Sequence, residues 1–226
     1  HIGIFQTDYR TVLSVPDGFR SNDLFSEKDY QCMTVRERIQ LFADYFSKRG
    51  NMVIFNHPHW SCNYEEDLYG YENFAAAELF NHGAARNDAS GESVDHYRYC
   101  LSGGMYLYGL STDDAHTAVD IGGGYVVVSA PEITREAIGR SLEKGWFYSS
   151  TGAEITDFRA EGNRVVLSCT NARQIRWNVF GDVRKTECGT GLSSSEFIAK
   201  KGDWVWADIE DHNGKKAWTN PIEIIE

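Results

Sequence analysis

The stretch that decides the fold is MVIFNHPH (residues 52–59), in which a wholly apolar run passes directly into two histidines. Its first four residues are all apolar, which is the pattern of a parallel strand buried on both faces. Residues 34–50 precede it and predict an amphipathic helix, with Thr34 as the N-cap and Glu37 three residues further on. A helix followed by a buried strand favours an α/β sheet, in which ligands collect at the carboxyl ends of the strands.

The same alternation continues along the chain. Further strands and helices are expected in the order strand 74–80, helix 93–101, strand 105–110, strand 125–128 and helix 131–145. Such an order predicts a parallel sheet or barrel, because parallel strands need crossover connections. From about residue 152 short β-rich runs separated by Gly, Asn and Asp predict a small antiparallel sandwich. An irregular stretch rich in Ser, Asp and Gly is expected at 14–29.

Composition limits the class of protein. A hydrophobic content of 42% suits a folded core, and a net charge of -11 argues against a surface for long nucleic acids. The five cysteines form no CxxC pair, which argues against a disulfide scaffold or zinc ribbon. No apolar stretch is long enough for a membrane span, so we expect a soluble, cytoplasmic protein. The chain starts at His1 without a methionine, so we expect that it belongs to a longer protein whose targeting signal is out of view.

Two predicted strand ends carry residue types that bind metals. His57 and His59 follow one strand, and Asp113, Asp114 and His116 follow another. Imidazole nitrogens and carboxylate oxygens bind zinc, manganese or iron, and such ions activate water for hydrolysis. Either group alone is common on ordinary surfaces. Their placement at successive strand ends favours a divalent-metal hydrolase.

Four motifs in this order resemble those of the PHP (polymerase and histidinol phosphatase) superfamily: His57-Pro58, Glu78–Asn81, Gly109–His116 and Gly145–Gly152. The resemblance covers roughly residues 50–155 and is closest to the branch of metal-dependent phosphoesterases with a terminal β domain. It implies an α/β fold in which residues 1–152 form the C-terminal part of an incomplete PHP-type (β/α)7 barrel. Residues 153–226 would then form a small all-β sandwich domain.

The resemblance also implies a set of metal ligands. His57, Asp114 and His116 match ligands of the family, and His1 matches the histidine that follows the family's second motif. The family opens with a His-x-His strand, a Thr-Asp-His element and a glutamate that bridges metals, and none of these precedes His1. The resemblance therefore implies association with a missing N-terminal segment that completes the metal cluster.

Three other residues are candidates for catalytic roles. Glu78 would lie near the metals or contact substrate, although a rim carboxylate that caps a loop is equally compatible with its position. Asp113 would orient a histidine. His59 would act as a general acid toward a substrate oxygen, and a simple loop hydrogen bond is the favoured alternative.

The leading hypothesis is a PHP-like hydrolase in which a metal-activated water hydrolyses a small phosphoester. The expected partner is a small phosphorylated substrate, with neither a long nucleic acid nor a membrane. One alternative keeps the metal site and changes the bond to an amide or carbamate. Another is a non-catalytic protein that binds a carbohydrate or partner through Trp204, Trp206 and Trp218, unless these tryptophans belong to the core.

Overall fold

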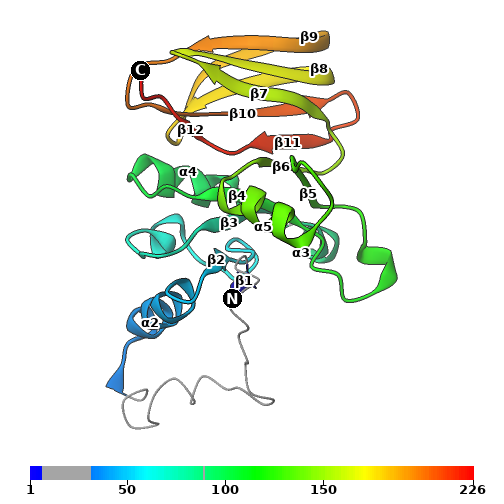
Figure 1. Ribbon diagram of the computed structural model, residues 1–226. Helices are drawn as coiled ribbons and strands as arrows, with labels where there is room; N and C mark the ends of the chain where they lie inside the picture. Colours follow the sequence, from blue (N-terminus) through cyan, green and yellow to red (C-terminus); the bar gives the residue numbers. More distant parts are fainter. Residues whose placement is uncertain (7–31, 89) are drawn as a thin grey trace.

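The computed structural model describes residues 1–6, 32–88 and 90–226. The irregular stretch expected at 14–29 lies outside the described residues. Figure 1 shows two layers of sheet stacked one above the other, with helix α4 (Val94–Ser102) between them. The functional candidates all come from the layer that holds the N-terminus.

The first sheet has four short strands in the order β1-β2-β3-β4: β1 (Ile2–Gln6), β2 (Asn51–Phe55), β3 (Ala76–Asn81) and β4 (Tyr108–Thr112). Strands β2, β3 and β4 run parallel, and β1 runs antiparallel to β2. The predicted buried strand at 52–55 is confirmed, since β2 lies between two other strands.

Helix α2 (Val35–Ser47) precedes β2 and confirms the helix predicted at 34–50. The Thr34 hydroxyl accepts a hydrogen bond from the Glu37 backbone, and the Glu37 carboxylate accepts one from the Thr34 backbone. This reciprocal capping satisfies amide groups that the first turn of a helix leaves open. Ala43 and Phe46 of α2 pack into the core against Val53 of β2.

The remaining helices are short, and two of them follow β3. They are α3 (His82–Asp88), α4, α5 (Arg135–Glu143) and the 3-10 turns η2 (Glu65–Leu68) and η3 (Ala118–Asp120). Helix α4 supplies the crossover between β3 and β4 that parallel pairing requires. The helices predicted at 93–101 and 131–145 are confirmed by α4 and α5.

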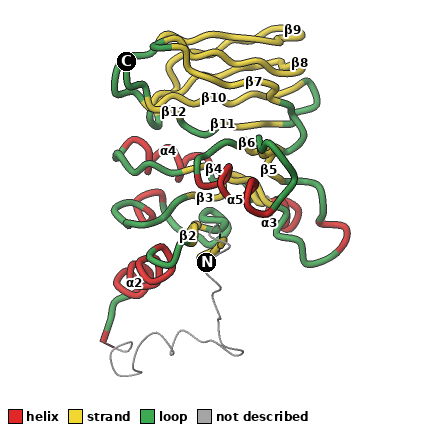
Figure 2. Tube along the Cα trace, viewed as in Figure 1, coloured by secondary structure: helices red, strands yellow, loops and turns green. Residues whose placement is uncertain are grey.

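The second sheet is antiparallel throughout and has eight strands: β5 (Tyr125–Val128), β6 (Phe147–Ser150), β7 (Ile155–Glu161), β8 (Arg164–Val179), β9 (Asp182–Ile198), β10 (Trp204–Asp211), β11 (Lys216–Thr219) and β12 (Ile222–Glu223). Its main order is β5-β6-β11-β10-β8-β7, with β9 paired to β8 and β12 to β10. Figure 2 shows its long strands above the helical layer.

The fold class predicted from the sequence is wrong. The structure is 42% strand and 23% helix, with four α-helices in the described ranges, and it contains no (β/α)7 barrel. The strand at 125–128, expected in the parallel sheet, pairs antiparallel with β6. The segment from 113 to 124 explains this outcome. It contains only a 3-10 turn, and a crossover back to a parallel position usually needs a helix.

The C-terminal part is also not a sandwich of two sheets. It is one antiparallel sheet curled into half a barrel, and β5 and β6 belong to it. Residues 125–150 are therefore in the second sheet, although the sequence groups them with residues 1–152. The domain boundary at 152/153 stays a prediction, because sheet membership alone does not define an independently folding unit.

The two sheets share a core that is rich in aromatic side chains. Trp206 is fully buried and Trp218 is 1% exposed, and both join the core cluster of the first sheet. Trp206 makes an edge-on contact with Tyr97 of α4, with ring centroids 5.5 Å apart. These two tryptophans hold the layers together, so their rings are not free to stack on a sugar.

Within the described ranges, no helix combines the length and the apolar character that a membrane crossing requires.

Candidate functional site

The candidate site lies where β2, β3 and β4 end. These strands are parallel, so their carboxyl ends meet at the same edge of the sheet. His57 follows β2, Asn81 is the last residue of β3, and Asp113 follows β4. The expectation that strand ends bring distant groups together holds for this edge of the sheet, even though the barrel itself is absent.

Glu78 ties the three parallel strands together. Its carboxylate is 5% exposed, and Oε2 accepts hydrogen bonds from the His57 backbone N–H at 2.6 Å and from Asn81 Nδ2 at 3.0 Å. Oε1 accepts a hydrogen bond from the Thr112 hydroxyl at 2.9 Å. The register between β3 and β4 shifts next to Glu78, and such irregularities re-aim side chains. With both oxygens engaged, Glu78 is placed to position its neighbours.

His57 and His1 face each other. His1 Nδ1 and His57 Nε2 are 3.1 Å apart, and the rings meet edge-on with centroids separated by 4.8 Å. Strand β1 places His1 here, since Ile2 pairs with Phe55 at the end of β2. His57 is 6% exposed, and its Nδ1 lies 3.0 Å from the Ser61 hydroxyl. Two predicted ligands from distant parts of the chain therefore come together.

The backbone at His57 and Asp114 is in the left-handed region, with φ angles of 30° and 47°. Residues other than glycine rarely adopt this conformation, and it costs of order 1 kcal/mol or more per residue. At His57 the backbone N–H donates a hydrogen bond to Glu78.

Asp114 is connected to the other residues at this edge through Asn81, and His116 is connected through Asp114. The Asp114 Oδ2 atom accepts a hydrogen bond from Asn81 Nδ2 at 3.1 Å, so Asn81 links Asp114 to Glu78. His116 is exposed, and its Nδ1 donates to the backbone carbonyl of Asp114 at 2.8 Å. Only Nε2 of His116 is therefore available for another ligand.

The four predicted ligands do not form one compact group. Among the residues that the structure describes, no three His, Cys, Asp or Glu side chains lie close enough together to hold an ion. His1 and His57 lie at hydrogen-bond distance, and the same separation is compatible with a shared ion. Two nitrogens bound to one tetrahedral zinc ion at about 2.0–2.1 Å lie about 3.3 Å apart. The observed 3.1 Å is close to this separation.

Asp113 turns away from the histidines and organises the loop before β5. Its two oxygens accept hydrogen bonds from the backbone N–H groups of Gly122, Gly123 and Gly124 at 2.7–2.9 Å. Burial opposes ionisation of Asp113, but these three donors and the nearby His82 together lower its pKa below the ordinary value. The observed contacts of Asp113 are with this loop, and its predicted role of orienting a histidine stays a prediction.

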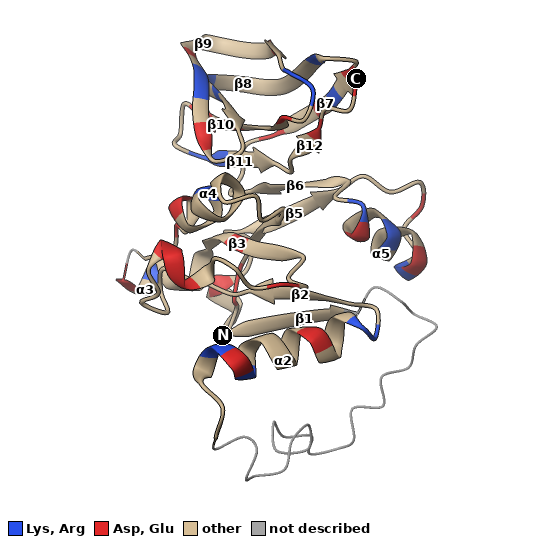
Figure 3. Cartoon of the chain, turned by 90° about the vertical axis from the view of Figure 1, so that its left-hand side faces the viewer, with Lys and Arg blue, Asp and Glu red and all other residues tan. Residues whose placement is uncertain are grey.

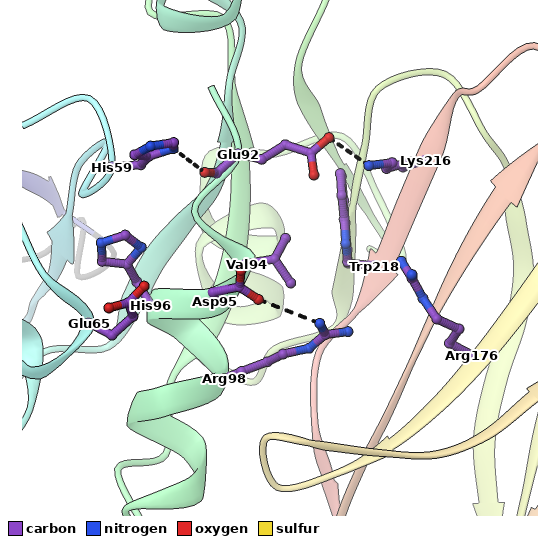
Figure 4. Close-up of a pocket in the computed structure, with 10 residues that line it drawn as sticks. All are labelled: His59, Glu65, Glu92, Val94, Asp95, His96, Arg98, Arg176, Lys216 and Trp218. Carbon is purple, nitrogen blue, oxygen red and sulfur yellow. Dashed lines mark hydrogen bonds and ion pairs between the residues drawn. The ribbon is translucent and has the colours of Figure 1, made fainter. Parts of the chain in front are cut away.

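His59 lies apart from His57. Its Nδ1 donates to the backbone carbonyl of Glu92 at 2.9 Å, and its backbone N–H donates to the Ser93 hydroxyl at 3.2 Å. It lines a cavity whose walls do not include the other six predicted site residues (Figure 4). The hydrogen bond to Glu92 is the loop contact that the sequence analysis favoured. The proposed acid role stays a prediction.

Sequence reasoning gave Asn81 no role, although this residue is central to the edge. It is fully buried, and its Oδ1 accepts a hydrogen bond from the Ala84 backbone N–H at 2.8 Å, which caps helix α3. Its amide group at the same time donates to Glu78 and Asp114. A signal was present in the sequence, because Asn is a preferred N-cap and here directly follows an apolar strand.

Comparison with known proteins gives no relative: no family model, curated protein or solved structure matches this chain. The resemblance to the PHP superfamily therefore stays a prediction based on its four motifs. Any functional proposal has to rest on the geometry of the site.

Proposed function

We propose that this chain is a metal-dependent hydrolase of small phosphoesters, with His1 and His57 as the nitrogen ligands of a divalent cation. The single observation that carries the proposal is the facing pair of ring nitrogens, 3.1 Å apart, at the carboxyl edge of a parallel sheet. A second ring contact supports it, because Trp60 packs edge-on against His57 at 4.9 Å and shields that side of the pair.

Each neighbouring residue has a role in this proposal. Glu78 holds the backbone of His57, and Ser61 lies within hydrogen-bond distance of Nδ1, so the ring is fixed with Nε2 toward His1. Partners of this kind set the tautomer and direction of metal-binding histidines. Asn81 keeps the Asp114 carboxylate at the same edge, where it can accept a proton or a hydrogen bond.

A divalent cation held here would polarise a phosphoryl oxygen and lower the pKa of a coordinated water. Zinc, manganese and iron all suit nitrogen ligands, and two protein nitrogens leave positions open for substrate. The chain itself contributes the fixed imidazoles, a nearby carboxylate on Asp114 and the partial shielding by Trp60.

Metal binding by single variants tests the proposal. Isothermal titration with zinc and with manganese is expected to show at least a tenfold weaker affinity for His57→Ala than for the unchanged chain, because one of two nitrogen ligands is lost. His1→Ala should behave likewise. His212→Ala is the matched control, since His212 is an exposed residue of a turn in the second sheet. Equal affinities of His57→Ala and His212→Ala would contradict the proposed site.

A substrate screen then tests the reaction. Small phosphomonoesters and phosphodiesters should be hydrolysed in the presence of the metal that binds, and His57→Ala should lose this activity. The same screen includes aryl carbamates and amides, because the alternative hydrolase would use the same histidines. Turnover of carbamates without turnover of phosphoesters would assign the second reaction and reject the first.

A further inference from the structure

A cavity separate from the His1–His57 pair lies between the two layers of the fold. It has a volume of about 490 Å³ and is lined by residues of the η2 segment, helix α4 and strands β8 and β11. This size is in the range of small-molecule sites. Figure 4 shows His59, Glu65 and His96 on one side and Arg176, Lys216 and Trp218 on the other, with Arg98 extending between them.

The first side of the cavity presents groups that need a hydrogen-bond donor. His96 is 5% exposed, and its Nε2 donates to the backbone carbonyl of Asn63 at 2.8 Å. In the neutral ring Nδ1 is then an acceptor, and it has no hydrogen-bond partner. Glu65 is half-buried on the same side, and no ion pair or hydrogen bond of its side chain is found within the described part of the chain.

Arg98, which extends between the two sides of the cavity, presents hydrogen-bond donors that require an acceptor. Its Nε is buried and has no hydrogen-bond partner, its terminal nitrogens lie 3.7 Å from Asp95 and Asp208, and it donates a 3.3 Å hydrogen bond to Asn178 Oδ1. The other cations are better paired. Arg176 donates to Asp208 at 2.6 Å, and Lys216 donates to Glu92 at 2.6 Å. Arg98 therefore has the longest polar contacts of the three cations in the lining.

The charges of the lining balance. Arg98, Arg176 and Lys216 face the carboxylates of Glu65, Glu92 and Asp95, so neither a simple anion nor a simple cation matches the cavity. A ligand that carries a donor at one end and an acceptor at the other would match both sides. Val94 adds apolar surface that suits a hydrocarbon side chain.

We propose that this cavity binds a zwitterionic amino compound, either a free α-amino acid or a dipeptide. The ammonium group donates hydrogen bonds to Glu65 and His96, and the carboxylate accepts them from Arg98. Buried polar groups without partners are uncommon in folded proteins, and the two unpartnered nitrogens, His96 Nδ1 and Arg98 Nε, both belong to residues of this lining. This inference does not depend on the proposed hydrolase activity.

Calorimetric titration with four probes tests the proposal: L-leucine, L-leucyl-L-leucine, N-acetyl-L-leucine and L-leucine amide. The acetylated compound lacks the ammonium group, and the amide lacks the carboxylate. At least one of the two zwitterions is expected to bind, and each singly blocked leucine should bind at least about tenfold more weakly than the tighter zwitterion. The relative affinities of leucine and the dipeptide distinguish the two sources of the same chemistry.

Two pairs of variants locate the binding. Glu65→Gln and Arg98→Gln are each expected to weaken binding of the better zwitterion about tenfold or more. Glu66→Gln is the matched control for the first, because Glu66 is exposed and is not part of the lining. Arg184→Gln is the control for the second, since Arg184 lies on the exposed strand β9. Both controls should bind within about twofold of the unchanged chain.

The half-buried position of Glu65 means that Glu65→Gln should fold even if the Arg98 variant does not. The proposal is overturned if neither zwitterion binds at millimolar concentration, or if the blocked compounds bind as well as the zwitterions. It is also overturned if Glu65→Gln binds like Glu66→Gln.

Discussion

The two sheets differ in what they bury. At the carboxyl ends of β2 and β3 in the first sheet, the buried side chains include the polar residues His57, Glu78 and Asn81. In the second sheet, buried polar side chains such as Asn178 and Asp208 lie within the strands, beside large apolar side chains such as fully buried Ile175 and Trp177. Buried polar groups stabilise a fold only weakly even when hydrogen-bonded, whereas apolar burial is the main stabilising term. We infer that the apolar interior of the second sheet supplies much of the stability of the fold.

The two sheets also differ in the length and direction of their strand pairing. Strands β8 and β9 form a long antiparallel ladder, while β2 and β3 share a short parallel one. Acidic and basic residues of the second sheet form exposed ion pairs such as Arg164 with Glu161. Figure 3 shows where the two residue types lie along the strands. Each sheet also buries an acidic residue, Glu78 in the first and Asp208 in the second. In the first sheet, left-handed backbone at His57 and Asp114 and buried polar side chains occur together at the edge where the candidate site lies.

Removal of a core tryptophan from the second sheet should have the largest effect. Trp177→Ala is expected to lower the free energy of unfolding by about 3–5 kcal/mol, because it leaves a large cavity. It also removes the hydrogen bond from Trp177 Nε1 to the Ser195 hydroxyl, which is 2.8 Å long. Urea denaturation followed by circular dichroism would measure the change.

The matched control for this change is Trp146→Ala, because Trp146 is 53% exposed. Its main recorded contact is with Lys144, whose Nζ lies 4.4 Å from the ring centroid. The control is expected to cost about 1 kcal/mol or less. If both variants lost the same small amount, the second sheet would not be the main source of stability.

An intermediate effect is expected at the polar edge of the first sheet. Glu78→Ala leaves the His57 backbone N–H, the Asn81 amide and the Thr112 hydroxyl without their acceptor, and should cost about 2–3 kcal/mol. Glu78→Gln keeps one carbonyl oxygen and should cost less. The same denaturation experiment measures both. An unchanged midpoint for Glu78→Ala would show that these hydrogen bonds do not hold the edge.

The local features of the first sheet could be predicted from the sequence because they depend on neighbouring residues. Thr34 and Glu37 lie at the spacing of a capping box, and the apolar run before Asn56 has the pattern of a buried parallel strand. The assignment of His1 and His57 as metal ligands came from a different source, the resemblance to a known family. The two rings are in contact, and their role as ligands stays a prediction.

The global arrangement could not be predicted in the same way. The strand at 125–128 has an apolar run like that of β2, and only its partner, β6, makes it antiparallel. Such pairing depends on long-range contacts that no local pattern records. The buried positions of Trp206 and Trp218 also depend on packing between layers. A tryptophan in sequence reads equally as core or as a binding surface.

The smallest effect should appear in the pH dependence of the loop that joins the two sheets. Asp113 has a lowered pKa in the folded chain, since three glycine N–H groups outweigh the opposing effect of burial. Its contribution to stability should be fully present well above the unfolded-state pKa of about 3.9 and be lost as the pH falls through the lower folded-state value. The stability advantage of the unchanged chain over Asp113→Asn should therefore be constant from about pH 6 to 7 and shrink below about pH 4.

Subtraction of the two pH profiles removes the contributions of the other carboxylates, such as Asp120, whose pKa is also lowered. What remains reports Asp113 and its contacts with Gly122, Gly123 and Gly124. Thermal unfolding midpoints between pH 3 and 7 would provide both profiles. A difference that stays constant across this range would mean that the carboxylate charge does not hold the loop. The chain between the two sheets would then owe its conformation to the glycines themselves.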